Sequence, residues 1–248
     1  MPPEPLSTQE FASRCCFLVL AWIGVTAALF GIGQFIVHSH TITNVDRHIT
    51  AWAVAHRTPA LDSAMRAITW IGSWVATAVV GGIVLGLVLT KRLAPRALAL
   101  FAVAWAGEYA AVNLIKYAVG RPRPPKDLWL VAAHGASFPS GHAANATLVC
   151  AVVVVVVFLC SPCRRARSSA VTLAVVACAA VACSRVELGV HWTTDVVAGC
   201  LVALAWLAAV AGLVATAVPL TVPRPPADRQ ERTGSPPGSP PGSTIGMR

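Results

Sequence analysis

Residues 143–160 read AANATLVCAVVVVVVFLC, a valine-rich run that contains no charged side chain. In a soluble protein such a run would fit a buried β-strand as well as a helix. Its length and its apolar neighbours favour a membrane helix, because a bilayer core needs about 20 mostly apolar residues in a helix and lipid tolerates only helices and closed barrels. We therefore predict that this run crosses a membrane.

Five further apolar runs flank it on both sides. They cover residues 15–37, 67–90, 97–119, 168–184 and 196–218, of which 168–184 is the shortest. The chain of 248 residues is 56% hydrophobic and 12% charged, whereas soluble domains have about 25% charged residues. The sequence predicts an all-α fold, a polytopic membrane bundle of six transmembrane helices.

The predicted chain has three parts. We expect an N-terminal cytoplasmic segment at residues 1–14, a six-helix transmembrane domain at residues 15–218 and a disordered tail at residues 219–248. The tail is rich in Pro, Gly and Ser, and such a composition buries too little apolar surface to fold.

The Lys and Arg residues between the runs predict the orientation of the chain. With the N-terminus inside, the inner segments hold 11 of these residues and the outer segments 8, which the positive-inside rule favours. We expect a multi-pass protein of the cell membrane with both termini cytoplasmic. This topology accounts for the net charge of +9, and no nucleic-acid-binding motif accompanies it, so we expect no nucleic-acid partner. The oligomeric state stays open.

Four dense polar segments fall on the extracytoplasmic side of this layout. They end the third run, begin the fourth, end the fifth and begin the sixth: KYAVGRPRPP at 116–125, FPSGH at 138–142, SR at 184–185 and HWTTD at 191–195. The loops on the opposite side carry nothing comparable. This segregation predicts one functional site, built from segments 116–142 and 184–195, at one membrane face.

Three cations in these segments predict a site for an anion with several oxygens. Lys116, Arg123 and Arg185 have no carboxylate cluster to neutralise them, and Arg offers paired donors that match phosphate while Lys adds a point charge. Ser140 and Gly141 stand where a helix should begin, and the free N–H groups of a helical first turn bind anions. No set of metal ligands accompanies these donors, so we expect a phosphate site without metal or other cofactor.

Two histidines in the same segments predict the chemistry. His191 and Asp195 are four residues apart, so they share one face of a helix or of its lead-in, and Asp195 can accept a hydrogen bond from one imidazole nitrogen. The other nitrogen is then a better nucleophile. His142 can act as a general acid toward a leaving oxygen. Together these residues predict a single catalytic site.

Other polar residues have plainer interpretations. We assign Arg121 and Lys126 to membrane topology or to contact with lipid headgroups. Five further histidines are interpreted as solvated: His38, His40, His48, His56 and His134. Residues 44–57 fit either a short interfacial helix at the rim of a lipid entrance or an ordinary connector. Glu108 fits either a functional acid or a protonated side chain bonded to a neighbouring helix.

The order and spacing of the motifs resemble a known signature. Lys116-x6-Arg123-Pro124, Pro139-Ser140-Gly141-His142 and Ser184-Arg185-x5-His191-x3-Asp195 resemble the three-part signature of the phosphatidic acid phosphatase type 2 superfamily. That superfamily includes lipid phosphate phosphatases, vanadium haloperoxidases, glucose-6-phosphatases and some lipid phosphotransferases. The motifs cover residues 116–195, and the six-span layout extends the resemblance across about residues 15–218.

The resemblance implies a role for each matching residue. It implies that His191 attacks phosphorus and forms a phosphohistidine, that Asp195 orients His191, and that His142 protonates the departing oxygen and later activates water. The remaining matches would hold the phosphoryl oxygens: Lys116, Arg123, Ser140, Gly141 and Arg185. The family works without metal, which agrees with the cations and backbone donors found here.

Two positions depart from the family pattern. Thr193 and Thr194 stand where members often have Pro-Ser, and Glu187 stands where they often have an aromatic residue. Neither departure removes a catalytic atom. Glu187 could partly neutralise the pocket or contact a cationic headgroup, and its effect stays open.

The sequence thus predicts a metal-independent membrane phosphatase whose substrate is a lipid phosphate or diphosphate of the polyprenyl diphosphate, phosphatidate or phosphatidylglycerophosphate class. An outward-facing site slightly favours polyprenyl diphosphate recycling. A lipid phosphotransferase, which passes the phosphoryl group from His191 to a hydroxyl, would carry the same signature. A non-catalytic anion-binding membrane protein would not need His142, His191 and Asp195, and a haloperoxidase is disfavoured because six spans suit soluble oxidation chemistry poorly.

Overall fold

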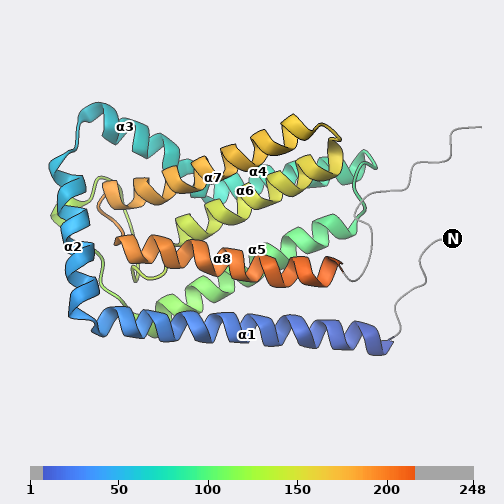
Figure 1. Cartoon of the computed structure of the whole chain (residues 1–248), viewed down its shortest axis with the longest axis horizontal. Helices are drawn as coiled ribbons and strands as arrows, with labels where there is room; N and C mark the ends of the chain where they lie inside the picture. The colour runs from blue at the N-terminus through green and yellow to red at the C-terminus, as the bar shows by residue number, and fades with distance from the viewer. Residues whose placement is uncertain (1–7, 216–248) are drawn as a thin grey trace, which may run out of the picture.

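The computed structural model describes residues 8–215, and this part of the chain is entirely helical, without a β-strand (Figure 1). The elements are α1 (Thr8–His38), α2 (His40–Ala55), α3 (Pro59–Ile68), η1 (Thr69–Gly72), α4 (Trp74–Leu89), α5 (Arg96–Val119), η2 (Lys126–Leu128), α6 (Gly141–Cys160), α7 (Arg164–Glu187) and α8 (Thr193–Ala215). The predicted all-α fold is confirmed. The predicted tail at 219–248 and the first seven residues of the predicted N-terminal segment lie outside the described residues.

Five long helices and one bent helix pair are the candidate membrane crossings of residues 8–215. Helices α1, α5, α6, α7 and α8 are each long and apolar enough to cross a bilayer. Pro59–Gly72 and Trp74–Leu89, two halves inclined by 46° to each other, are long and apolar enough for a sixth crossing when they are counted as one span. The six predicted runs therefore correspond to the six crossings, but the second run is a broken helix rather than the continuous one that its hydropathy predicted.

The break in the second crossing is stabilised by a side chain of α6. Ser73 has an extended backbone and caps α4 by accepting a hydrogen bond from the N–H of Ala76 at 3.4 Å. Asn145 donates to the carbonyl oxygens of Gly72 at 3.1 Å and Ser73 at 2.8 Å, and it accepts a bond from Thr77 Oγ1 at 2.7 Å. Non-helical backbone inside a membrane protein is tolerated where such partners satisfy it.

Small residues let the other helices approach closely. Ala111 of α5, Ala144 of α6 and Ala198 of α8 are buried in one core cluster. Close backbone approach of this kind is the usual basis of helix packing in lipid, where the hydrophobic effect adds little between helices. Two indoles add hydrogen bonds, from Trp206 to the carbonyl of Ala104 at 2.9 Å and from Trp22 to that of Gly107 at 2.8 Å.

Helix α2 crosses one end of the bundle, at a steep angle to the long helices (Figure 1). By sequence, residues 44–57 fit either a short helix or an ordinary connector, and the structure has a helix there, at His40–Ala55, with Asp46, Thr50 and Ala53 on its buried face. Val45 and Trp52 are exposed on its outer surface, where an interfacial helix would meet lipid. The ends of α5 and α7 and the starts of α6 and α8 lie at this same end, as the parity of the spans predicted.

Candidate active site

The residues predicted for the site come together at the α2 end of the bundle. They are Lys116 in the last turn of α5, Arg123 in the next loop, Ser140, Gly141 and His142 at the start of α6, Arg185 in the last turn of α7, His191 in the α7–α8 turn, and Asp195 in the first turn of α8. Four helix ends therefore converge on one place, and all eight predicted residues belong to it.

The turn between α7 and α8 presents His191. Gly189 has a φ of 72°, and a Cβ at this position would collide with the carbonyl oxygen of Leu128, so only glycine fits without strain. The backbone N–H of His191 donates to the carbonyl of Arg185 at 3.2 Å. The imidazole is only 2% exposed. The local backbone thus fixes His191 in a buried position between the two helices.

The two ring nitrogens of His191 have different environments. Nε2 lies 3.0 Å from Nη1 of Arg123, and because a guanidinium can only donate, Nε2 is the unprotonated nitrogen. Nδ1 then carries the proton and faces Oδ2 of Asp195 at 3.4 Å. This separation is long for a hydrogen bond, as is common in catalytic sites without substrate. The tautomer leaves the lone pair of Nε2 directed into the cationic site.

Burial sets the charge of His191. Removal from water lowers the pKa of this imidazole from 6.5 to about 3, and the nearby charges of Arg123 and Lys116 also lower it, while Asp195 opposes the shift. Desolvation dominates because the ring is enclosed on all sides. His191 is therefore neutral near pH 7, which is the form that can act as a nucleophile.

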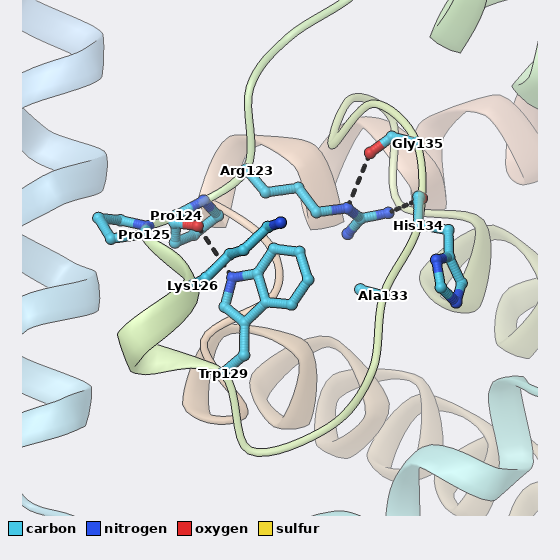
Figure 2. Close-up of a pocket in the computed structure, with 8 residues that line it drawn as sticks. All are labelled: Arg123, Pro124, Pro125, Lys126, Trp129, Ala133, His134 and Gly135. Atoms are coloured by element: carbon cyan, nitrogen blue, oxygen red, sulfur yellow. Dashed lines mark hydrogen bonds between the residues drawn. The ribbon is translucent and has the colours of Figure 1, made fainter.

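Arg123 is held by the loop that precedes α6. Its Nε donates to the carbonyl of Gly135 at 3.0 Å, and its Nη2 donates to the carbonyl of His134 at 2.8 Å (Figure 2). Nη2 also donates to the carbonyl of Ala136 at 3.3 Å. Its Nη1 donates to the carbonyl of Val190 at 2.7 Å as well as to His191. Each N–H of the guanidinium thus has a protein acceptor, and an incoming phosphate has to compete for them.

The other two cations have spare donors. Arg185 is buried and donates from Nη1 to Thr69 Oγ1 at 2.8 Å, but its Nε is buried without a hydrogen-bond partner. Within residues 8–215 Arg185 forms no ion pair. Lys116 donates from Nζ to the carbonyl of Ala136 at 2.8 Å. A buried guanidinium without a carboxylate is costly unless an anion joins it, which is the expected environment of a phosphate site.

His142 and Ser140 stand at the start of α6. Ser140 caps the helix by accepting from the N–H of Ala143 at 3.4 Å, and its own N–H donates to the carbonyl of Asp195 at 2.8 Å. His142 is half-buried and interacts electrostatically with Arg185, and also with the other two cations of the site. This places a second imidazole beside the cations.

The prediction that Arg121 contacts lipid headgroups is wrong. Arg121 is only 4% exposed, and its Nη1 donates to Oδ1 of Asp195 at 2.6 Å. Its Nη2 donates to Oδ2 of Asp46 on α2 at 2.7 Å. The sequence analysis did not assign Arg121 or Asp46 to the site, because an Arg in a proline-rich loop and an Asp in an interfacial helix are usually solvated. Lys126 is exposed, as that interpretation requires.

Two acids lie away from this cluster. The carboxylate of Glu187 pairs with Arg57, whose Nε is 3.8 Å from Oε1, and the backbone carbonyl of Glu187 accepts hydrogen bonds from the same guanidinium. Glu187 therefore faces the connection between α2 and α3. Glu108 is buried in α5, and its carboxyl group makes no hydrogen bond to any described residue, so of its two interpretations the one with a bond to a neighbouring helix finds no partner among residues 8–215.

A pocket of about 510 Å³ opens on the outer side of Arg123 (Figure 2). Lys126 points into the space between Arg123 and the ring of Trp129, whose indole N–H donates to the carbonyl of Pro124 at 2.9 Å. His134 lines the opposite wall. The approach to the site from this side is thus lined by cations and by an aromatic ring.

Comparison with known proteins agrees with this arrangement. The sequence profile of the PAP2 superfamily matches residues 96–219. A transmembrane PAP2-type phosphatidylglycerolphosphate phosphatase from Bacillus subtilis is 26% identical, with a TM-score of 0.67 over 80% of this chain and 94% of that protein. LpxE from Aquifex aeolicus shares the fold at 20% identity, with a TM-score of 0.52 over 66% of this chain and 93% of that protein. No curated protein sequence matches the chain significantly.

Proposed function

The chain belongs to the PAP2 superfamily, and on that premise we propose that it is a multi-pass membrane enzyme that hydrolyses a lipid phosphate or diphosphate through a phosphohistidine. One observation carries the proposal. The neutral imidazole of His191 has its unprotonated Nε2 directed into a cluster of three cations and its other nitrogen directed at Asp195. An anion-binding protein needs the cations but has no use for a buried nucleophile with an orienting carboxylate.

The cations and the start of α6 would bind the phosphoryl group. Arg185 has a buried free N–H, Lys116 carries a flexible charge, and Arg123 can exchange its contact with His191 for a phosphoryl oxygen. The first-turn N–H groups of α6, which follow Ser140 and Gly141, would add backbone donors. These donors are aimed at the oxygens on which negative charge concentrates during phosphoryl transfer.

The reaction then proceeds in two displacements. In the first, the lone pair of His191 Nε2 forms a bond to phosphorus, the bond from phosphorus to the lipid oxygen breaks, and His142 gives its proton to that oxygen. In the second, His142 takes a proton from water, the resulting hydroxide attacks phosphorus, and the P–N bond breaks to free His191. Asp195 holds the Nδ1–H of His191 and stabilises the positive charge that the ring acquires in the first displacement and keeps until the P–N bond breaks in the second.

The substrate would be an amphiphile whose phosphate lies at headgroup depth. The site stands at the membrane end where α2 lies across the bundle, so a lipid could reach it without leaving the bilayer. The similar Bacillus subtilis protein is a phosphatidylglycerolphosphate phosphatase, which supports this class. Within it we include phosphatidylglycerophosphate, phosphatidate and polyprenyl diphosphate, and we propose an extracytoplasmic site with both termini in the cytoplasm.

Phosphate release from purified protein tests the proposal. Wild-type protein in detergent or proteoliposomes should release phosphate from at least one of these three lipids, and should do so in EDTA. Vanadate should inhibit, because it imitates the five-coordinate phosphoryl group. A metal requirement, or activity that persists in His191→Ala, would overturn the mechanism. Adding an acceptor alcohol separates hydrolysis from phosphotransfer, since a transferase would form a new phosphate ester at the expense of free phosphate.

A further inference from the structure

We propose that Asp46 of α2 is a positioning residue for catalysis, which keeps Asp195 aligned with His191 and keeps its charge available. The inference rests on the proposed role of His191 as nucleophile. Asp46 lies outside residues 96–219, the segment that matches the family profile. It is 1% exposed, although α2 crosses the end of the bundle and presents an apolar surface outward.

The carboxylate of Asp46 is fully engaged. Oδ2 accepts a hydrogen bond from Arg121 Nη2 at 2.7 Å and another from Thr194 Oγ1 at 2.5 Å. Oδ1 accepts from the backbone N–H of Thr194 at 3.0 Å. Helix α8 begins at Thr193, so this N–H is one of the first-turn groups that have no partner within their own helix. Asp46 therefore caps α8 from another helix, and the first turn of α8 contains Asp195.

Asp46 is also connected to the carboxylate of Asp195 through a side chain. Arg121 bridges Asp46 and Asp195, with Nη2 on the former and Nη1 on the latter at 2.6 Å. Nη1 also donates to Thr194 Oγ1 at 2.7 Å. Asp195 is thus fixed through its backbone by the capped helix and through its side chain by the guanidinium. Its other oxygen, Oδ2, is left for His191 and for the N–H of Trp192.

Charge gives Asp46 a role beyond packing. Two carboxylates share one guanidinium, so Asp46, Arg121 and Asp195 together carry one net negative charge. Without Asp46, the charge of Arg121 would neutralise Asp195 alone. The ring of His191 becomes positive when Nε2 bonds to phosphorus, and a neutralised partner would stabilise that ring less. Asp46 therefore offsets Arg121 so that Asp195 can act on His191.

The experiment compares two inhibitors in Asp46→Asn. Vanadate bonds to His191, so its binding needs an imidazole that Asp195 both aligns and stabilises as a cation. Orthophosphate is held only by the three cations and by the first-turn N–H groups of α6. We expect kcat to fall about tenfold or more, with KM almost unchanged, because the carboxylate that orients a reacting imidazole acts on the chemical step. The inhibition constant for vanadate should rise by a similar factor, and that for orthophosphate should stay the same. A loss of folded protein alone would change neither inhibition constant.

Arg47→Gln provides the matched control. It removes a charge from the neighbouring position of the same helix, but Arg47 is exposed, and its side chain hydrogen-bonds only to Asn44 within residues 8–215. This variant should keep the wild-type kcat and both inhibition constants. If it lost activity like Asp46→Asn, the effect would belong to α2 as a whole and the specific role of Asp46 would be refuted.

A second pair of variants decides the matter if Asp46→Asn does not fold. Thr194→Val removes the hydroxyl that lies between Asp46 and Arg121, and Thr194→Ser keeps it. We expect weaker vanadate inhibition in Thr194→Val and wild-type behaviour in Thr194→Ser. Vanadate inhibition in Thr194→Val equal to that of the wild type, and in Asp46→Asn too where that variant folds, would overturn the inference while phosphate release still depended on His191. Loss of that dependence would instead refute the proposed function.

Discussion

Arg123 donates a hydrogen bond to His191 at 3.0 Å, and the acceptor is Nε2, the nitrogen that the proposed reaction uses. In the structure without substrate the nucleophile is therefore covered by a residue of its own phosphate site. A phosphoryl group that takes over this N–H would uncover Nε2 at the moment when phosphorus arrives beside it. Binding and activation of the nucleophile are coupled through this one contact.

Replacing Arg123 tests the coupling. Arg123→Lys keeps the charge but loses the fork that reaches both the 134–136 backbone and the phosphate, so we expect kcat/KM to fall about 100-fold. Lys126→Gln is the matched control, because it removes an exposed cation from the same loop but leaves the hydrogen bond from Arg123 to His191 in place. Steady-state kinetics should show no comparable loss for Lys126→Gln. Equal losses in the two variants would indicate a general effect of loop charge.

Removing the nucleophile should abolish turnover. His191→Ala should lower kcat by about a thousandfold or more while the protein still inserts into the membrane, because the variant lacks the imidazole that the proposed reaction bonds to phosphorus. Rapid quenching with labelled substrate should trap an acid-labile phosphoenzyme in wild type and none in His191→Ala. A phosphoenzyme that survives in the variant would show that another residue is the nucleophile.

Burial of His191 predicts a pH-dependent stability. In the folded protein burial lowers the pKa of His191 to about 3, against 6.5 for a solvated imidazole. Between these values the unfolded chain binds one proton more than the folded protein, so the free energy of unfolding falls with falling pH by about 1.4 kcal/mol per pH unit. Above a pH of about 6.5 neither state binds this proton, so the contribution of His191 to the free energy of unfolding no longer changes with pH.

Melting curves in detergent can check whether the protein becomes less stable as the pH falls. The melting temperature of the wild type should drop as the pH is lowered from about 6.5 to 5, and His191→Gln, which cannot titrate there, should drop less. Parallel curves for the two proteins would mean that the folded state does not exclude the proton from His191.

Features that depend on short segments of sequence could be predicted, whereas pairings between distant residues could not. Hydropathy identified all six crossings, and their parity brought four helix ends to one face without any knowledge of packing. The spacing of His191 and Asp195 correctly predicted that they would face each other. Arg121 and Asp46 were missed because they are 75 residues apart in sequence, and neither has a polar neighbour that reveals the pairing. A weak signal existed, since Asp46, Thr50 and Ala53 form a stripe opposite the apolar one on α2.

The broken second crossing was missed for a similar reason. Hydropathy does not register a break when the flanking residues remain apolar, and the partner that permits it, Asn145, belongs to another run.

Asn145→Ala would leave the carbonyls of Gly72 and Ser73 without that donor in a buried place, so we expect a loss of about 2 kcal/mol in the free energy of unfolding. Asn113→Ala is the control, because Asn113 is exposed and bonds only within α5. Similar unfolding curves for both variants would contradict this role.

The proposed orientation can be tested separately from the chemistry. The eight cysteines, all free and some exposed, would first be replaced by serine, with phosphate release confirming that the protein remains active. A single cysteine is then placed at exposed Lys126, beside the site, or at exposed Arg92, in the turn between α4 and α5. If the site is extracytoplasmic, an impermeant maleimide should label Lys126→Cys on intact cells and Arg92→Cys only after the membrane is opened. The reverse pattern would place the site on the cytoplasmic side. The proposed reaction on His191 would be unaffected. The enzyme could then act only on lipid phosphates whose headgroups lie in the inner leaflet.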